Sequence, residues 1–554
     1  MKRRRSNRRA ASKKATRATR SASPLADRIA ICVLVLVALI AVMTFRDYGL
    51  SWDDYTHSQY GELLLALYAS GFKDQRALSF VNLYFYGGGF DMAAALAAKV
   101  LPFDLFETRR LIGAGVGLIG LIATWRLGRR LGGPIAGLAA LVLLATCPLY
   151  YGHMFMNPKD APFAVAMIVL LWAIVRALDE YPNPGRRTVL FVGVGIGIAF
   201  GSRILAGVAV LYTAAGMLLI LAEDSSANRL RPALTRLARF VWLMLPAVLV
   251  GYLIMGLLWP WSILSPLNPV YATEYFSNFF EKPWRELYQG RLISVPDMPA
   301  SYLPHLFSLK LPEIMLLLGL SGAAGAFVAV TRANVPLNRR ASLLAVTLAA
   351  LLPIVIAMLM RPALYNGVRH FIFVVPPFAV LGGISSGWLA EHLRVYGKAA
   401  PAALAIAVAG GLALPVSDMV RLHPYQYTAF NWASGGVQMA HDKYMLDYWG
   451  LAFKQAGEAL RARLDAIPLK PPPGRRWIIE ICGPQRPAEL ALGPDFETTW
   501  DRKRADFAMM LGTYYCRDLK APLLIEITRE GIDYARVYDI RGGPVPKLLT
   551  EPPP

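Results

Sequence analysis

Apolar segments of 13 to 22 residues recur along the first three-quarters of the chain, separated by shorter polar stretches. A helix of about 20 residues spans the roughly 30 Å hydrocarbon core of a bilayer, so segments of this length are typical of membrane-spanning helices. An odd number of spans places the two ends of a chain on opposite sides of the membrane. The pattern predicts eleven spans, at residues 29–45, 111–125, 134–149, 161–175, 188–200, 204–222, 238–259, 311–330, 341–359, 370–389 and 399–416.

The composition agrees with this pattern. Of the 554 residues, 55% are hydrophobic and 17% are charged, and the mean hydropathy is +0.41. This balance excludes a soluble enzyme, a collagen, a coiled coil or a disordered tail as a description of the whole chain. We therefore predict an all-α polytopic membrane bundle of about eleven transmembrane helices with a small C-terminal extracytoplasmic α/β domain.

The charge is distributed unevenly. Residues 1–28 carry a net charge of +10 out of the total of +21. Five short loops, each of which follows an even-numbered span, carry another +10. Basic loops stay in the cytoplasm, so we interpret this charge as a topology signal and not as a nucleic-acid site. The loops are residues 126–130, 176–187, 223–239, 332–340 and 391–398.

This topology divides the chain into three parts. Residues 1–28 form a basic cytoplasmic tail, residues 29–417 a transmembrane domain, and residues 418–554 a C-terminal domain outside the cytoplasm. The outer loops are then residues 46–110, 150–160, 260–310 and 361–369.

The region after residue 418 changes in character. It contains an amphipathic helix near residues 448–464, a proline-rich hinge at 468–474, and strand-like runs at 477–481, 510–515, 523–529 and 534–540. It is poor in His and paired carboxylates, so we predict a lid or acceptor-docking element, with a structural cap as the alternative. Its only two cysteines, Cys482 and Cys516, predict a disulfide in an oxidising compartment, and two unpaired buried thiols are the alternative.

The first outer loop carries an acidic pair directly after the first span. Asp53 and Asp54 are adjacent, and His57 follows one helical turn later. One carboxylate can act as a general base, and the other can orient an acceptor or a metal ion. A helix N-cap or a solvated turn is the simpler interpretation of the pair alone.

Two further outer loops carry candidate ligands. Lys159 and Asp160 precede the fourth span, where Lys159 suits a phosphate and Asp160 suits an acceptor, a metal or the helix N-cap. Arg361, Arg369 and His370 lie between the ninth and tenth spans, and an arginine fork binds phosphate through charge-assisted hydrogen bonds.

Arg203, between the fifth and sixth spans, is a further candidate. Snorkelling of the side chain to the interface is the alternative for each arginine. For one site to form, the outer ends of the first, fourth and tenth spans have to lie together.

Several of these motifs together resemble bacterial glycosyltransferase family 39, of the GT-C superfamily, whose relatives include the protein O-mannosyltransferases and the lipid A aminoarabinose transferases. The resemblance covers roughly residues 29–455. It rests on residues 51–54, 152–163, 369–371, 423–427 and 447–450.

The resemblance implies a membrane glycosyltransferase of the bacterial inner membrane. It implies a polyprenyl-phosphate sugar as donor, a lipid, glycan or protein as acceptor, contact with membrane lipids and none with nucleic acid. Transfer is either metal-independent or assisted by a divalent metal. By the resemblance, Asp53 takes the position of the catalytic base, and Asp54 that of its neighbour, which is usually Glu.

Each remaining candidate receives a role in the same scheme. Asp160 helps to hold the acceptor or a metal. The other candidates bind the substrate; they are Lys159, Arg361, Arg369, His57 and His370. Of these, Lys159, Arg361 and Arg369 are the candidates for the carrier phosphate.

The chemistry needs little beyond these groups. A carboxylate removes the proton of an acceptor hydroxyl as it attacks the anomeric carbon, and fixed cations stabilise the departing phosphate. This is a single displacement with inversion. A polytopic transporter or lipid flippase is the rival interpretation, but no correspondence between two halves of the chain supports it.

Overall fold

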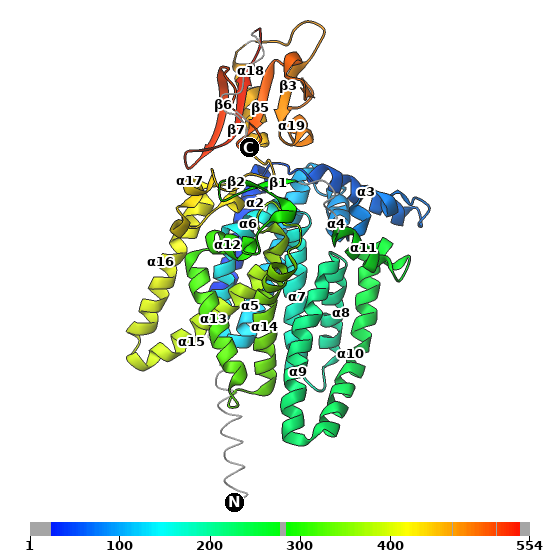
Figure 1. The fold of residues 1–554 in the computed structure, drawn as a ribbon, viewed down its shortest axis with the longest axis vertical. Helices are drawn as coiled ribbons and strands as arrows, with labels where there is room; N and C mark the ends of the chain where they lie inside the picture. The colour runs from blue at the N-terminus through cyan, green and yellow to red at the C-terminus, as the bar shows by residue number, and fades with distance from the viewer. Residues whose placement is uncertain (1–23, 278–283, 468, 517, 543–554) are drawn as a thin grey trace, which may run out of the picture.

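The computed structural model describes residues 24–277, 284–467, 469–516 and 518–542. Long helices form a bundle, and a small sheet domain stands on one end of it (Figure 1). The described chain starts near the opposite end of the bundle and runs toward the sheet domain. We call the end that faces the sheet domain the outer end.

Each of the eleven predicted spans coincides with a helix. Nine helical segments of the described residues are long and apolar enough to cross a membrane. One of them, α5, covers two predicted spans, and α8 is shorter, with 15 residues. The predicted fold class is therefore confirmed. The helices are α2 (Pro24–Thr44), α5 (Leu105–Ala145), α7 (Asp160–Asp179), α8 (Arg186–Phe200), α9 (Val208–Asn228), α10 (Leu230–Leu258), α13 (Glu313–Thr331), α14 (Leu337–Met360), α15 (Val375–Leu393) and α16 (Ala399–Arg421).

Helix α5 is a hairpin that continues through the predicted loop 126–130. The chain reverses at Gly133, whose φ of 86° is readily adopted by glycine, and Pro134 begins the second arm. The arms touch closely, because a Cβ atom on Gly128 would lie 3.0 Å from the Cβ atom of Ala140.

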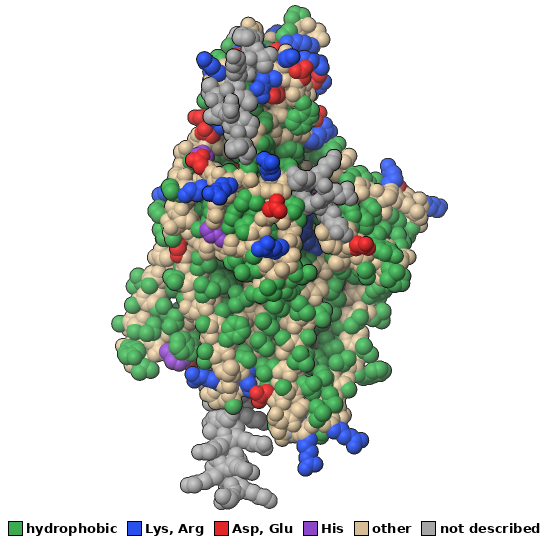
Figure 2. All heavy atoms as spheres, viewed as in Figure 1, with side chains coloured by type: hydrophobic (Ala, Val, Ile, Leu, Met, Phe, Trp, Pro, Cys, Tyr) green, Lys and Arg blue, Asp and Glu red, His purple; other side chains and the backbone are tan. Residues whose placement is uncertain are grey.

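Apolar side chains cover the sides of the bundle, and Lys and Arg side chains gather at its lower end (Figure 2). Glycines allow close packing between the helices of the bundle, as where Gly197 of α8 lies against Ile254 of α10. The loops at the lower end include the basic loops that follow α9 and α15. That this end faces the cytoplasm remains a prediction from the charge.

Short elements build the outer end. The first outer loop contains α3 (Asp54–Ala69) and α4 (Gly89–Ala98), and the second contains α6 (Pro148–Met156). The loop between α10 and α13 contains α11 (Asn268–Ser277), the antiparallel strands β1 (Arg285–Tyr288) and β2 (Arg291–Ser294), and α12 (Tyr302–Lys310). A 3-10 helix, η7 (Arg369–Val374), leads into α15.

The C-terminal domain is a mixed sheet in the order β4-β3-β5-β7-β6. β3 pairs in parallel with β4 and β5, and β7 pairs antiparallel with β5 and β6. Buried residues of α18 and of the strands share one apolar core, which includes Leu460, Ile479 and Met509. The elements are α18 (Phe453–Ala466), β3 (Trp477–Cys482), α19 (Gln485–Leu492), β4 (Phe496–Thr499), β5 (Phe507–Leu511), β6 (Leu523–Arg529) and β7 (Ile532–Asp539).

The predicted disulfide is confirmed. Cys482 at the end of β3 is bonded to Cys516, with their Cα atoms 5.6 Å apart. The predicted strand at 510–515 instead ends at Leu511, because Gly512 packs directly against the backbone of Asp533 and the chain turns there toward Cys482.

Candidate active site

Asp53 lies directly before α3, and its carboxylate meets side chains from two other outer segments. Its Oδ2 atom is 3.2 Å from Nζ of Lys159, which precedes α7. The same oxygen is 4.0 Å from Nη1 of Arg369, at the start of η7. The outer ends of three predicted spans therefore meet, and they bring the candidate base next to two candidate phosphate ligands.

Asp160, the first residue of α7, forms a second acid–cation pair. Its Oδ1 atom lies 2.8 Å from Nη1 of Arg203, in the connection between α8 and α9. Its Oδ2 atom accepts a hydrogen bond of 2.9 Å from Nδ2 of Asn157. Asn157 also accepts from the backbone N–H of Asp160 at 2.8 Å, so Asn157, and not Asp160, caps this turn. Both carboxylate oxygens of Asp160 are thus fixed.

The ring of Tyr86 lies beneath two of the cations. Its centroid is 5.2 Å from Nζ of Lys159 and 5.4 Å from Cζ of Arg203. An aromatic face attracts a cation electrostatically without neutralising its charge. Tyr86 therefore positions both cations and leaves their charge available to a ligand.

Arg369 is held in a similar way. Its guanidinium lies 4.8 Å from the ring centroid of Tyr365 and 4.7 Å from that of Trp449. His370, the next residue, is half-buried and packs edge-on against Tyr365 at 5.0 Å. The two rings fix the direction of the guanidinium, which is the condition for a preorganised phosphate site.

The cluster has a surplus of positive charge: three cations, Lys159, Arg203 and Arg369, surround two carboxylates, Asp53 and Asp160. The Asp53 side chain is 32% exposed, whereas the Asp160 side chain is 2% exposed. The cluster therefore opens to the surface at Asp53. This arrangement suits an anionic ligand.

The environment of Asp53 keeps its carboxyl ionised. Burial alone would raise the pKa of Asp53, but the charges of Lys159, Arg369 and His57 outweigh burial and lower the pKa to about 2. Burial likewise acts to lower the pKa of Lys159, and Asp53 reverses this, so that the pKa lies above its usual value. Both groups are charged at neutral pH.

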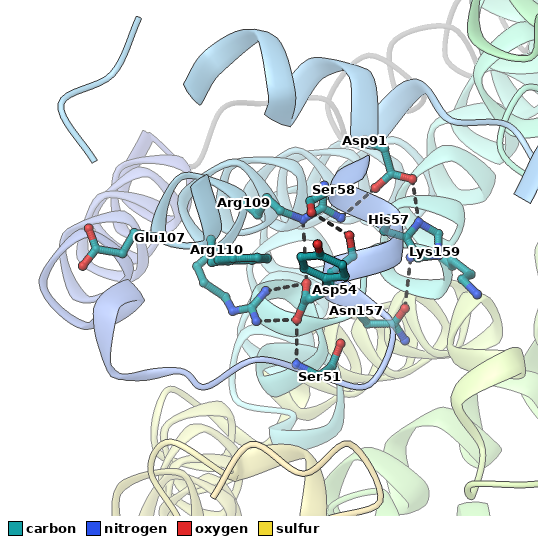
Figure 3. Close-up of polar contacts among 12 residues, drawn as sticks. Ser51, Asp54, His57, Ser58, Asp91, Glu107, Arg109, Arg110, Asn157 and Lys159 are labelled. Atoms are coloured by element: carbon teal, nitrogen blue, oxygen red, sulfur yellow. Dashed lines mark hydrogen bonds and ion pairs between the residues drawn. The ribbon is translucent and has the colours of Figure 1, made fainter. Parts of the chain in front are cut away.

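Asp54 faces away from this cluster. Its Oδ1 atom accepts a hydrogen bond of 2.9 Å from Arg110 of α5, which also pairs with Oδ2, and Oδ2 accepts from the backbone N–H of Ser51 at 2.7 Å (Figure 3). Both oxygens are thus occupied within the protein. These contacts favour a role for Asp54 in fixing the start of α3 over a role on the substrate.

His57 belongs to a buried network of polar contacts behind α3. Its Nδ1 atom lies 2.6 Å from Oδ2 of Asp91 on α4, and Nη2 of Arg109 donates to the other oxygen of Asp91 at 2.7 Å (Figure 3). Arg109 also approaches Asp54 at 3.7 Å. These contacts connect α3, α4 and α5 to one another. His57 itself lies one helical turn after Asp53.

The structure gives Arg361 no part in the cluster. Arg361 ends α14 in a left-handed conformation, with a φ of 47°, and its side chain is exposed. In the described part of the chain, no ion pair or hydrogen bond links it to the cluster. The left-handed turn directs the chain away before Arg369 enters the site, and Arg203 supplies the third cation instead.

The motif around residue 447 forms one wall of the site. Asp447 accepts hydrogen bonds from the hydroxyl of Tyr427 and from the backbone N–H groups of residues 450–452. The hydroxyl of Tyr448 lies 3.2 Å from Nε2 of the buried His153, in the second outer loop. Trp449 then reaches Arg369, so the two motifs hold each other and the phosphate-binding candidate.

A buried carboxyl, Glu286 of β1, anchors the loop before Arg369. It accepts hydrogen bonds from the backbone N–H groups of Asn366 at 2.8 Å and Gly367 at 3.3 Å, and from the hydroxyl of Tyr302 at 3.0 Å. Burial raises the pKa of Glu286 against these hydrogen bonds. The β1–β2 hairpin is thereby connected to the cluster.

The donor groups do not fit a divalent metal ion. A metal ion prefers several free oxygen or nitrogen ligands. Among the described residues, no group of three or more His, Cys, Asp and Glu side chains could hold a metal. Asp160, the predicted metal candidate, is paired with Arg203 inside a cluster that is already positive. The residues fit an anion instead.

Sequence reasoning missed part of this arrangement. Tyr86 gave no signal, since one tyrosine in an aromatic loop is unremarkable in composition. Asp91, Arg109 and Arg110 did carry a signal: charges beside or within apolar runs are costly unless they pair with each other. Their pairing depends on which helices are neighbours, and the spacing along the chain does not contain this information.

Part of the chain matches a known protein family. Residues 90–252 match the family described as dolichyl-phosphate-mannose-protein mannosyltransferase. The predicted resemblance is confirmed for this segment. The segment includes Lys159, Asp160 and Arg203. A comparison with curated proteins gives no significant match.

Solved structures with a similar course of the chain include ArnT from Cupriavidus metallidurans bound to undecaprenyl phosphate. It has 14% sequence identity and a TM-score of 0.46, and the alignment covers 94% of this chain and 100% of that one. The same ArnT in the apo state has 13% sequence identity and a TM-score of 0.46, and the alignment covers 93% of this chain and 98% of that one. A third match is the archaeal oligosaccharyltransferase AglB from Archaeoglobus fulgidus in complex with an inhibitory peptide and a dolichol-phosphate. It has 14% sequence identity and a TM-score of 0.45, and the alignment covers 81% of this chain and 62% of that one.

Proposed function

We propose that this protein is a membrane glycosyltransferase that moves a sugar from a polyprenyl-phosphate donor to an acceptor at the outer face of the membrane. The observation that carries the proposal is the carboxylate of Asp53, partly exposed and set between Lys159 and Arg369. The carboxylate of Asp53 can accept a proton, and the side chains of Lys159 and Arg369 can hold the phosphate that leaves the sugar.

The three cations form the phosphate site. Lys159, Arg203 and Arg369 converge from three outer segments, and aromatic rings fix each of them. Charge-assisted hydrogen bonds from such groups are strong and directional. The sides of the bundle are apolar (Figure 2). Because the site lies at the outer end of this bundle, a phosphate on a lipid chain can reach it while the lipid chain stays beside the apolar helices.

The reaction is a single displacement. Asp53 takes the proton of the acceptor hydroxyl as its oxygen bonds to the anomeric carbon. The bond between that carbon and the phosphate oxygen breaks, and its electron pair goes to the phosphate. Lys159, Arg203 and Arg369 stabilise the charge that develops there. The anomeric configuration inverts, and no sugar becomes attached to the protein.

We propose that the transfer needs no metal ion, since fixed cations already occupy the place where a metal would neutralise the phosphate. The proposed setting is the bacterial inner membrane, with residues 1–28 in the cytoplasm and the C-terminal domain outside. The C-terminal domain, proposed at residues 418–554, contacts the start of α3, where Nη2 of Arg486 donates to the hydroxyl of Tyr55 at 3.2 Å. This contact supports a role in covering the site.

Purified protein in proteoliposomes tests the proposal. A polyprenyl monophosphate carrying a radiolabelled sugar is added together with membrane lipids and proteins as acceptors. We expect label in the acceptor fraction, with inverted configuration, in the presence of EDTA, and none with Arg369→Ala. Carrier-dependent uptake of label into the vesicles without transfer would favour the transporter.

A further inference from the structure

The carboxylate of Asp53 and a donor phosphate require the same two cations. Lys159 is 3.2 Å and Arg369 is 4.0 Å from one oxygen of Asp53, and both are also the ligands proposed for the phosphate. Asp53 is therefore in the position of a counter-ion that the phosphate has to displace.

We infer that Asp53 has a second role, as a competing anion that occupies the phosphate-binding cations until the donor lipid arrives. In the free protein Asp53 is bound to Lys159, and when the phosphate draws Lys159 and Arg369 to itself, Asp53 is released as a base. The donor then has to bind before the acceptor can be deprotonated. This inference rests on the proposed function.

The charges around Asp53 support this order. The groups that act on it are Lys159 from the second outer loop, Arg369 from η7 and His57 from α3 itself, and together they hold the pKa of Asp53 at about 2. A carboxylate with so low a pKa is a weak base at neutral pH, and a general base works best when its pKa is near the working pH. A phosphate that compensates the two cations raises the pKa of Asp53 and makes it more basic.

The other acidic residue of the cluster is arranged differently. Asp160 is 2% exposed, and both of its oxygens are held, by Arg203 and by Asn157. Among the residues that the structure describes, the carboxylate of Asp53, at 32% exposure, forms ion pairs only with Lys159 and Arg369. Asp53 is thus the carboxylate that can change partners without leaving a buried charge unpaired.

Binding of a polyprenyl monophosphate without a sugar tests the inference directly. Titration calorimetry with the full chain in nanodiscs compares wild type with Asp53→Asn, which keeps the size of the side chain and removes its charge. Removing a competing anion should tighten binding about tenfold, within the usual range of coupling between two sites. Asp47→Asn is the matched control, because Asp47 lies on the same loop but pairs with His423; it should change binding less than about twofold.

The pH dependence provides a second readout. Phosphate binding raises the pKa of Asp53, so wild type takes up a proton on binding once the pH falls below that raised value. The ratio of the affinity of Asp53→Asn to that of wild type should then shrink as the pH falls. Titration of the phosphate itself affects both proteins equally and cancels from this ratio. Asp53→Ser also lacks the charge and should bind the lipid phosphate more tightly than wild type. It therefore tests the inference independently of any effect of the Asn side chain on the fold.

The outcomes separate the two proposals. If wild type binds the lipid phosphate but Asp53→Asn and Asp53→Ser bind it equally or more weakly, the competing role is wrong and the proposed function stands. If none of the proteins binds the lipid phosphate, the proposed function fails and the inference fails with it.

Discussion

The guanidinium of Arg203 lies 2.8 Å from the buried carboxylate of Asp160, at the junction of three helices. This pair joins the connection between α8 and α9 to the first turn of α7, and it places a cation beside Lys159. A turn of a few residues thereby supplies the third of the proposed phosphate ligands.

Arg203→Ala should therefore weaken binding of a polyprenyl phosphate about tenfold or more, because a hydrogen bond to a charged group is worth about 1.5–3 kcal/mol. Arg203→Lys, which keeps the charge, should recover part of the loss. Calorimetry measures both variants. Arg361→Ala is the control, since Arg361 is exposed and outside the cluster, and it should bind like wild type. Equal losses at both arginines would contradict the placement of the site.

Asp91→Asn should destabilise the protein by about 3–5 kcal/mol, because it removes the closer of the two carboxylates that pair with the buried Arg109 and weakens the contact with His57. Thermal unfolding in detergent measures the loss. Asp74→Asn provides the comparison, since Asp74 pairs with an arginine that is 71% exposed, and should leave the midpoint unchanged. A midpoint for Asp91→Asn within the error of wild type would show that the buried network does not hold α3.

The disulfide between Cys482 and Cys516 should persist in protein isolated from the membrane. Peptide mass spectrometry without reduction is expected to find the two peptides linked, and Cys482→Ser with Cys516→Ser should destabilise the C-terminal domain by about 2–4 kcal/mol. Cys32, which is a free cysteine on the membrane helix α2, should react with alkylating reagents in the same sample once the protein is denatured. Alkylation of Cys482 and Cys516 without prior reduction would show that the two cysteines do not form a disulfide.

The topology is tested by reporter fusions. Alkaline phosphatase fused after Leu422, just beyond α16, should be active, because active phosphatase forms only outside the cytoplasm. The same reporter fused after Lys398, in the basic loop between α15 and α16, should be inactive. The reverse pattern would overturn the assigned orientation.

Much of the fold was predictable, because each span carries its own apolar signal. The eleven predicted spans coincide with helices, and the ends at Asp53, Lys159 and Arg369 come together as the prediction required. Charge explains why: three polar groups at helix ends are most stable where they can pair with each other.

The partners within the site were not predictable to the same degree. Arg203 and Arg361 look alike in the sequence, each in a short outer connection, yet the packing of α8 against α7 brings one to Asp160, and a left-handed turn keeps the other exposed. The pairing of Asp54 with Arg110 likewise depends on where α5 begins relative to α3. Such contacts arise from long-range packing, which local patterns do not record.

Asp53 is the proposed base of the sugar transfer. The most direct test is the rate of label transfer from the radiolabelled polyprenyl-phosphate sugar by Asp53→Asn, with Asp47→Asn as the control and the amount of inserted protein measured for each. Loss of a general base should slow transfer by about 10²–10⁴-fold in Asp53→Asn, while Asp47→Asn stays near wild type. Transfer by correctly inserted Asp53→Asn at a rate close to wild type would contradict the assignment of Asp53 as the base.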